Sequence, residues 1–319
     1  MADFDVFNGD ADGICALIQL RLAEPRDAVL VTGVKRDIAL LSHVEAGAGD
    51  RVTVLDISME KNSAALNQLL ARGAEVFYVD HHVPGTVPAS PLLKVLINEA
   101  PEACTSTLVD GHLQGAFRRW AVVGAFGDNL KRSAQALAAR AALSDEQVQQ
   151  LEKLGTYVNY NGYGASEADL HFAPAALYQQ LSRFDDPLAF IAADRETFGL
   201  LEAGFHGDMA LARAVQPLHA DATSALFVLP DQPWARRVSG VFSNELVNRF
   251  PDRAHAVLTE QADGTYLVSV RAPLNNRRGA AELCKEFPTG GGRAAAAGIN
   301  ALPAAMLDRF IERLRETWR

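Results

Sequence analysis

The chain has 319 residues, of which 49% are hydrophobic, and a formal net charge of −9. That length is enough for two domains with cores of their own, and the acidic balance argues against a dedicated duplex-binding protein, which would usually present a broad basic face. No apolar run is long enough to span a membrane, the first residues lack the pattern of a signal peptide, and the three cysteines are scattered. We therefore expect a cytoplasmic protein with unpaired thiols.

The first hundred residues predict strands that alternate with helices. Strands are expected at residues 2–7, 28–32, 52–56, 74–79 and 94–98, and helices at residues 14–22, 38–44 and 61–72. The strands are almost continuously apolar, which is typical of a parallel sheet covered by helices on both faces. The predicted fold class of this part is α/β.

Polar clusters follow the ends of several predicted strands. Asn8-Gly9-Asp10-Ala11-Asp12-Gly13 follows the first strand, Asp56 ends the third, and Asp80-His81-His82 follows the fourth. Parallel sheets bind ligands outside the carboxyl ends of their strands, so we expect these clusters to meet. The first cluster resembles the start of a calcium loop, but Gln19 stands at the twelfth position and a strand precedes it.

Carboxylates and imidazoles near a core must be paired, hydrogen-bonded or bound to a metal. Mixed ligands of this kind suit Mn²⁺, Fe²⁺, Co²⁺ or Zn²⁺, and the lack of thiolates argues against a structural zinc site. The number of carboxylates predicts more than one cation, as in sites where paired metals activate water and clamp a phosphoryl group. Taken singly, each cluster has a structural alternative: a solvated turn at residues 8–13, a helix cap at Asp56 and a hydrogen-bonded turn at residues 80–82.

The middle of the chain, from residue 103 to about residue 216, is expected to be helical. A hydroxyl side chain among residues 105–107 is predicted to cap one helix, and Ser144 to Gln147 form a predicted capping box. The helix that follows this box is expected to end near Gly155. Residues 157–164 are rich in aromatic and amide side chains and are predicted to form a loop.

The pattern changes to α+β near residue 220. Strands are expected at residues 226–229, 254–259 and 266–270, and helices at residues 237–249, 279–287 and 303–318. Gly290-Gly291-Gly292-Arg293 is predicted to present backbone N–H groups to a phosphate at the start of a helix, with a flexible loop as the alternative. Arg271 and the pair Arg277-Arg278 extend this basic region, although simple surface solvation also accounts for the pair.

Taken together, the motifs resemble those of the DHH phosphoesterases with a DHH-associated C-terminal domain, the superfamily of RecJ exonucleases and NrnA-type nanoRNases. The motifs are residues 8–13 (D-x-D-x-D-G in RecJ), Asp56, Asp80-His81-His82, Gly124 to Asp128, and Gly290 to Gly298 (GGGH-x-x-AAG in the family). The resemblance implies a parallel-sheet DHH domain at residues 1–190 that is helical from about residue 103. It also implies a helical connector at residues 191–220, a smaller α+β substrate-binding domain at residues 221–319, and an active site in the cleft between the domains.

The resemblance also implies roles for individual residues. The implied metal ligands are Asn8, Asp10, Asp56, Asp80, His81 and Asp128. The implied catalytic residues are Asp80 and His82, and the predicted substrate contacts are Arg271, Gly290, Gly291, Gly292 and Arg293. The implied cofactor is Mn²⁺, with two cations per site and Mg²⁺, Co²⁺ or Fe²⁺ as alternatives.

This chain departs from the family pattern at particular positions. Asn8 stands where RecJ has an Asp, the upstream His of the nanoRNases is missing, and Arg293 replaces the His of GGGH. The predicted function is a phosphoesterase, an exonuclease or oligoribonuclease, that uses metal-activated water to cleave phosphodiester or phosphomonoester bonds in short oligonucleotides or small nucleotides. The alternatives are a nucleotide-binding protein with weakened catalysis and a small-molecule phosphatase or pyrophosphatase. No membrane partner is expected, and both a monomer and a homodimer are compatible with the sequence.

Overall fold

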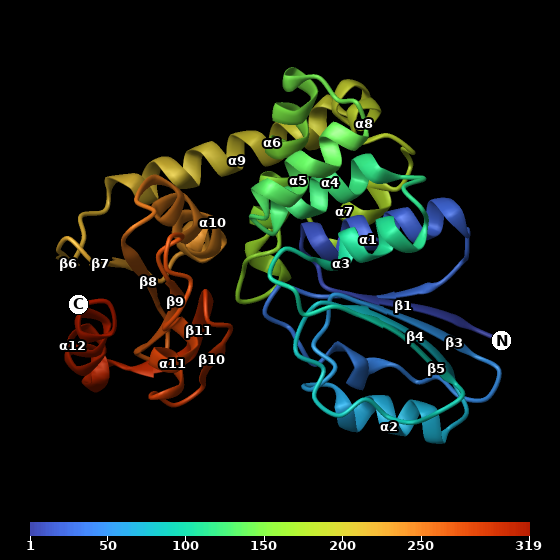
Figure 1. The fold of residues 1–319 in the computed structure, drawn as a ribbon, viewed down its shortest axis with the longest axis horizontal. Helices are drawn as coiled ribbons and strands as arrows, with labels where there is room; N and C mark the ends of the chain where they lie inside the picture. Colours follow the sequence, from blue (N-terminus) through green and yellow to red (C-terminus); the bar gives the residue numbers. More distant parts are fainter. The chain divides into compact units, whose positions relative to one another are not determined.

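Residues 1–202 and residues 203–319 form two separate units in a computed structural model that describes residues 1–319 (Figure 1). None of the helices combines the length and the apolar character that a membrane crossing requires. Helix α9 (Arg195–Ala214) carries the chain from the first unit into the second.

The first unit is built on a five-stranded sheet in which every neighbouring pair of strands is parallel, in the order β2-β1-β3-β4-β5. Its strands are β1 (Asp3–Phe7), β2 (Val29–Val31), β3 (Arg51–Leu55), β4 (Glu75–Asp80) and β5 (Leu93–Ile97). Phe7 pairs with Leu55 and Leu55 with Val79, so β1, β3 and β4 end level with one another. The predicted parallel sheet is confirmed, and its register brings the residues that follow these strands to one edge.

Helices cover both faces of this sheet. Helices α1 (Ala11–Ala23), α3 (Thr105–His112) and α4 (Arg118–Gly127) lie on one face, and α2 (Ser63–Ala71) lies on the other (Figure 1). Alternate residues of β3 and β4, such as Val54 and Tyr78, pack against the α2 side of the core. Helix α1 is buried from Ala11 to Leu20, which explains why its sequence is apolar all round rather than on one stripe.

The rest of the first unit is helical. Its remaining helices are α5 (Lys131–Arg140), α6 (Asp145–Asn161), α7 (Pro174–Leu181) and α8 (Pro187–Ala193), before α9. The capping box at the start of α6 is present as predicted: the Gln147 N–H donates to Ser144 Oγ at 3.3 Å, and the Ser144 N–H donates to Gln147 Oε1 at 3.0 Å.

The predicted end of α6 near Gly155 is wrong, because the helix continues to Asn161. Gly155 lies where α6 crosses α4, and a Cβ atom there would lie only 2.3 Å from the carbonyl oxygen of Val123. The glycine therefore permits close helix packing and does not end the helix. Tyr157 and Tyr160, which suggested a loop, are buried in the helix.

The second unit has a six-stranded mixed sheet in the order β10-β11-β9-β8-β7-β6, where only β7 and β8 pair in parallel. Its strands are β6 (His219–Ala220), β7 (Ser224–Leu229), β8 (Ala254–Glu260), β9 (Thr265–Arg271), β10 (Gly290–Gly292) and β11 (Ala296–Pro303). Its helices are α10 (Pro233–Arg249), α11 (Ala280–Lys285) and α12 (Leu307–Thr317). Leu258, Val270, Leu283 and Phe310 meet in one apolar core. The predicted α+β class is confirmed.

The glycine-rich segment does not begin a helix as the sequence predicted. Gly290 pairs with Ile299 and Gly292 with Ala297, so the segment is strand β10 of a hairpin with β11. Gly292 has φ +137°, and a Cβ atom there would lie 2.5 Å from the Cα of Ala297. Only glycine fits that approach without displacing the neighbouring strand. The alanines after Arg293 form the turn and the start of β11.

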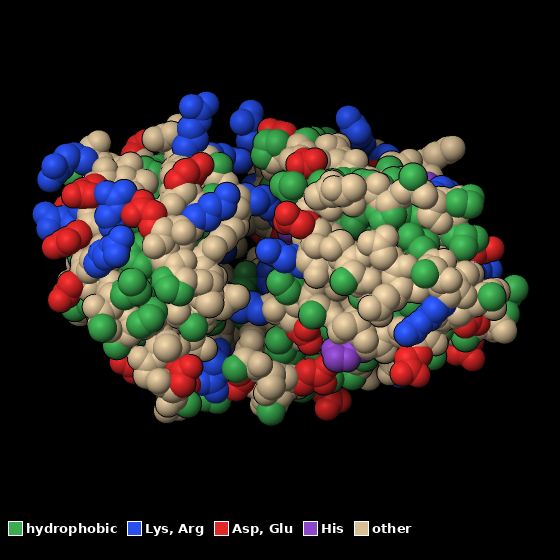
Figure 2. Space-filling view, turned by 90° about the horizontal axis from the view of Figure 1, so that it is seen from below, with side chains coloured by type: hydrophobic (Ala, Val, Ile, Leu, Met, Phe, Trp, Pro, Cys, Tyr) green, Lys and Arg blue, Asp and Glu red, His purple; other side chains and the backbone are tan.

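Charged side chains of both signs are interspersed on the face of the molecule seen in Figure 2. In the second unit, Arg313 forms ion pairs with Glu286 and Glu316, and Arg315 lies 4.0 Å from Asp221.

Candidate metal centre

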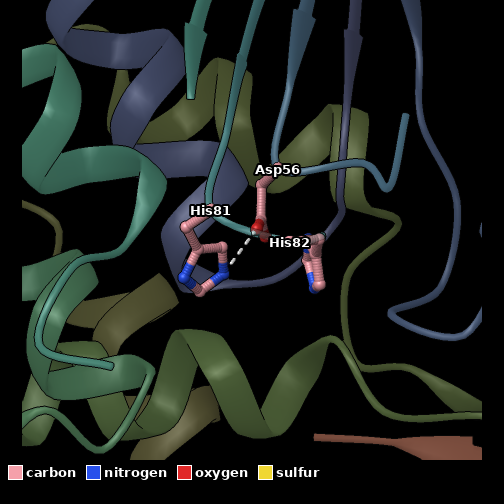
Figure 3. Close-up of side chains that lie close together, drawn as sticks. All are labelled: Asp56, His81 and His82. Carbon is pink, nitrogen blue, oxygen red and sulfur yellow. Dashed lines mark ion pairs between the residues drawn. The ribbon is translucent and has the colours of Figure 1, made fainter. Parts of the chain in front are cut away.

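Acidic side chains and histidines gather at the carboxyl edge of the parallel sheet. They are Asp10, Asp12, Asp56, Asp80, Asp128, His81 and His82. All except Asp128 and His82 are almost fully buried. In Figure 3, the side chains of Asp56, His81 and His82 converge from the ends of β3 and β4. The convergence follows from the level ends of the strands.

The ring of His81 is held in a fixed orientation. Its Nδ1 lies 2.8 Å from the carbonyl oxygen of Ala103 and donates to it, so Nε2 is the ring nitrogen that faces the carboxylates and that could bind a cation in place of a proton. Nε2 lies 3.3 Å from Asp56 Oδ1, 3.7 Å from Asp128 Oδ2 and 3.9 Å from Asp12 Oδ2. Burial lowers the pKa of His81, but the hydrogen bond to Asp56 and the surrounding carboxylates outweigh burial and raise it to about 10.

The neighbouring imidazole, His82, is oriented by Asp80. His82 Nδ1 lies 2.7 Å from Asp80 Oδ1, and the same oxygen accepts the backbone N–H of His81 at 2.8 Å. The side chain of His82 is 32% exposed, whereas that of Asp80 is buried. The other oxygen of Asp80 is buried and has no hydrogen-bond partner.

The carboxylate of Asp12 joins helix α1 to helix α3. It accepts the backbone N–H groups of Thr105 and Ser106 at 2.7 Å each. The N-cap residue of α3 is Cys104 rather than one of residues 105–107, but the predicted hydroxyl takes part in the cap, because Thr107 Oγ1 accepts the Cys104 N–H at 3.0 Å. The N–H groups of the first turn are satisfied by Asp12 from another helix. Burial and the nearby Asp128 raise the pKa of Asp12, so its charge is unfavourable without a cation.

Asp56 adopts a backbone conformation that non-glycine residues use sparingly. Its φ of +57° lies in the left-handed region, where Asp and Asn are enriched and where functional residues are often held. Its carboxylate accepts a hydrogen bond from Thr105 Oγ1 at 3.3 Å. Burial, followed by the charges of Asp10 and Asp12, raises the pKa of Asp56 well above its usual range.

Lys35 is a member of the cluster to which the sequence analysis gave no role. Its ammonium group forms an ion pair with Asp10, and it lies 3.0 Å from Asn159 Oδ1 and 3.6 Å from Asp128 Oδ1. Burial lowers the pKa of Lys35, but Asp10 and the other acidic neighbours raise it well above its usual range. The available signal was its position just beyond the second predicted strand, at the same edge of the sheet as the acidic clusters.

The atoms that are close enough to share a cation form two overlapping groups, Asp56 with His81 and His82, and Asp12 with His81 and Asp128. Within each group the ligand atoms lie within 4.8 Å of one another. Asp56, His81 and Asp128 were predicted as ligands, whereas Asp12 was noted only as part of its motif and His82 was assigned to the substrate.

The other predicted ligands, Asn8, Asp10 and Asp80, lie beside these groups. Asp10 caps α1 through Oδ1, which accepts the N–H groups of Asp12 at 3.0 Å and Gly13 at 3.1 Å, and its Oδ2 pairs with Lys35. Asn8 Oδ1 is buried without a hydrogen-bond partner, as is one oxygen of Asp80. Unsatisfied buried oxygens, an oriented imidazole and an excess of carboxylates fit a divalent cation such as Mn²⁺, Fe²⁺ or Co²⁺.

The predicted substrate contacts of the second unit gather at one end of its sheet. Arg271 pairs with Ala296 in register, next to the pair of Gly292 with Ala297. The side chain of Arg271 donates to Asn244 Oδ1 at 2.9 Å. Arg293 lies in the turn between β10 and β11, where its N–H donates to the carbonyl oxygen of Ala296 at 2.8 Å. Their contact with a substrate stays a prediction.

No family model and no curated protein matches the sequence, whereas solved structures match its fold over almost the whole chain. The exonuclease RecJ bound to manganese superposes with a TM-score of 0.62 and 19% identity, over 99% of this chain and 89% of that one. RecJ from Thermus thermophilus in complex with Mn²⁺ gives 0.60 and 19%, over 99% of this chain and 51% of that one. The pGpG-specific phosphodiesterase PggH from Vibrio cholerae gives 0.54 and 13%, over 99% of both chains. This chain has the fold of the DHH phosphoesterases.

The motif resemblance is thus confirmed at the level of the fold. In this DHH fold, Asp80-His81-His82 begins on the last residue of β4, and its neighbours across the sheet edge come from the ends of β1 and β3. The chain spans about half the length of the Thermus thermophilus RecJ, which therefore has parts that this chain does not match.

Proposed function

We propose that the protein is a metal-dependent phosphoesterase that hydrolyses phosphoester bonds in short oligonucleotides or small nucleotides. The observation that carries this proposal is the arrangement around His81, whose Nε2 faces the carboxylates of Asp12, Asp56 and Asp128 while its Nδ1 is bound to Ala103. The likeness of the fold to an exonuclease and to a pGpG-specific phosphodiesterase supports the same reaction class.

Asp12, Asp56, His81 and Asp128 are the residues that would hold the cation, which we propose to be Mn²⁺, with Mg²⁺, Co²⁺ or Fe²⁺ as alternatives. When bound, such a cation lowers the pKa of a water molecule and offsets negative charge on phosphoryl oxygens. His81 and Asp12 are already positioned by hydrogen bonds to the backbone, so little ordering is left for binding to accomplish.

His82 is the residue that we assign to the substrate phosphate. Asp80 binds its Nδ1, which fixes the orientation of the ring, so that the second ring nitrogen could contact a phosphoryl oxygen. In the second unit, Arg293, Arg271 and the β10–β11 hairpin are proposed to hold a more distant phosphate or the sugar. A short substrate suits this protein because its net charge of −9 disfavours a long polyanion.

The test is cleavage of end-labelled RNA and DNA, from dinucleotide to long single strand, with and without Mn²⁺, next to inorganic pyrophosphate. We expect Mn²⁺-dependent release of mononucleotides that is greatest for the shortest substrates. The Asp56→Asn variant should lose this activity, because Asn tolerates the left-handed backbone of residue 56 but supplies a neutral amide. Asp145→Asn, at an exposed position of α6, is the matched control and should keep it.

Two outcomes would contradict the proposal. Folded, Mn²⁺-loaded protein that cleaves no nucleic acid of any length would instead favour a nucleotide-binding protein, the alternative that Asn8 suggests. Cleavage of pyrophosphate alone would move the protein to the small-molecule phosphatases. In either case, metal binding measured on the same sample shows whether the centre itself is intact.

A further inference from the structure

The two overlapping ligand groups share one imidazole nitrogen, that of His81. Both contain His81, and each uses the single lone pair on Nε2, because Nδ1 is committed to the carbonyl oxygen of Ala103. One nitrogen lone pair binds one cation. A second cation at this edge would therefore have to rely on the other oxygens, which are those of Asp10, the second oxygen of Asp128 and the unpartnered oxygens of Asn8 and Asp80.

Lys35 already occupies the space between the carboxylates of Asp10 and Asp128. Its ammonium group pairs with Asp10 and lies 3.6 Å from Asp128 Oδ1, whereas Asp128 Oδ2 faces His81 Nε2 at 3.7 Å. The two oxygens of Asp128 thus point to different positive sites: one to the group around His81 and the other to Lys35. This is how a carboxylate bridges paired metal ions, but here one partner is an ammonium group.

Several contacts hold Lys35 in this position. Its backbone N–H donates to the carbonyl oxygen of Gly162 at 2.7 Å, and its ammonium group donates to Asn159, a residue that is only 2% exposed, at 3.0 Å. The ammonium group also lies 5.4 Å from the centre of the Tyr163 ring. Because α6 and the turn after it supply these partners, the position of Lys35 is built into the fold.

The departure of Asn8 from the family pattern belongs to the same arrangement. Asn8 Nδ2 lies 3.5 Å from the carbonyl oxygen of Lys35, a long contact that an amide can make as a donor and a carboxylate cannot. A neutral residue at position 8 also removes one negative charge from a region where Lys35 provides a single positive charge instead of the two of a metal ion.

We propose that this centre holds one divalent cation and that the ammonium group of Lys35 provides the second positive site, between Asp10 and Asp128. This inference rests on the proposed function and differs from the two cations expected from the sequence. It assigns a single-metal centre to a carboxylate cluster whose family pattern led us to expect a pair. Lys35 then offsets the charge of Asp10 and Asp128 permanently, independent of the metal concentration.

The test is the number of Mn²⁺ ions bound per chain of the full-length protein, from equilibrium dialysis with metal analysis, together with the electron paramagnetic resonance spectrum. We expect one Mn²⁺ per chain and the spectrum of an isolated ion. Lys35→Ala, which removes the charge and opens space, should bind a second Mn²⁺ at least roughly tenfold more tightly than the wild type and show spin coupling. Lys131→Ala, which removes an exposed lysine paired with Glu152 on the same unit, is the control and should stay at one ion.

Two Mn²⁺ ions per chain with spin coupling in the wild type would overturn the inference, and so would a folded Lys35→Ala protein that still binds only one. If Lys35→Ala does not fold, the wild-type stoichiometry and spectrum decide. The proposed function fails separately: a wild type that binds one Mn²⁺ but cleaves no phosphoester contradicts the function and leaves the single-metal centre intact.

Discussion

Buried charges at the carboxyl edge of the parallel sheet and on its amino side are treated in opposite ways. On the amino side of the carboxyl edge, Asp5 in the middle of β1 accepts from Arg21 through both oxygens, at 2.7 and 2.8 Å, and Arg21 also donates to Thr53 Oγ1 at 2.9 Å. At the carboxyl ends, Asp10, Asp12, Asp56 and Asp128 surround a single lysine and a single buried imidazole.

The comparison separates a structural charge from a functional one. On the amino side, the buried carboxylate of Asp5 is paired with the guanidinium group of Arg21, so neither charge needs a bound ion. At the carboxyl end, negative charge is in excess, which costs stability in the absence of a cation and creates affinity for one. A substitution on the amino side should therefore reduce stability, whereas a substitution at the carboxyl end should reduce activity.

Replacing Asp56 at the carboxyl end should have the largest effect. Asp56→Asn is expected to lower kcat by about 1,000-fold, because it removes charged oxygen from the proposed cation site. The same change should leave the metal-free protein as stable as the wild type or more stable, since a buried carboxylate whose pKa is raised by burial and by Asp10 is lost. Steady-state rates and urea unfolding in EDTA check both parts. Normal rates in this variant would show that Asp56 is not part of the cation site.

Replacing Arg21, on the amino side, should have the converse effect. Arg21→Met leaves the buried carboxylate of Asp5 without its partner and is expected to cost about 3 kcal/mol of unfolding free energy. The rate of cleavage per folded molecule should stay within about twofold of the wild type, because Arg21 lies at the far end of α1. Urea unfolding with activity measured on the same samples tests the separation. A large loss of activity at unchanged stability would show that the two regions are coupled.

The parts of this comparison that the sequence predicted are those set by local patterns. Continuous apolar strands with polar residues at their ends were enough to predict the parallel sheet and to place Asp56 and His81 at one edge. The cluster could be anticipated because strand ends in a parallel sheet meet whatever their separation along the chain.

The parts that the sequence did not reveal depend on contacts between distant segments. Lys35 is a single basic residue in a turn, and part of what holds it in the cluster is Asn159. The sequence pattern had predicted that the helix containing Asn159 ends before that residue. Asp12 satisfies the start of α3, about ninety residues later, which no local capping pattern can show. The glycines at 290–292 led to the prediction of a phosphate-binding loop. Glycine is also required at Gly292 for another reason, because a Cβ atom there would collide with Ala297 in the neighbouring strand β11.

The stability of the metal-free protein should depend on pH through the carboxyl end of the sheet. The folded pKa of His81 is about 10, above the unfolded value of about 6.5, so its stabilisation is fully present below pH 6.5 and is lost as the pH rises through about 10. The raised pKa of Asp56 acts in the same direction. We expect a loss of at least about 1 kcal/mol over this range in EDTA.

Urea unfolding between pH 6.5 and 10 measures this loss, and the difference between wild type and His81→Gln isolates it from other groups that titrate nearby. The loss should be absent in His81→Gln, and present in His43→Gln, an exposed histidine of the same unit. With Mn²⁺ the trend should weaken or reverse, because metal ligands bind in their deprotonated forms. If the unfolding free energy fell equally with pH in wild type and His81→Gln in EDTA, the carboxylates around His81 would not be stabilising its protonated form.

The smallest expected effect comes from a residue outside the sheet edge. Arg293→Ala, in the turn between β10 and β11, should raise KM for a dinucleotide about tenfold, the loss of one charge-assisted contact to a phosphate. The number of Mn²⁺ ions bound and kcat should not change, because Arg293 is proposed to bind substrate and not metal. Arg309→Ala, on α12 of the same unit, is the matched control and should leave KM unchanged. If Arg293→Ala also left KM unchanged, the hairpin would be a structural element only, and the recognition of substrate would then have to lie with His82 and its neighbours in the first unit.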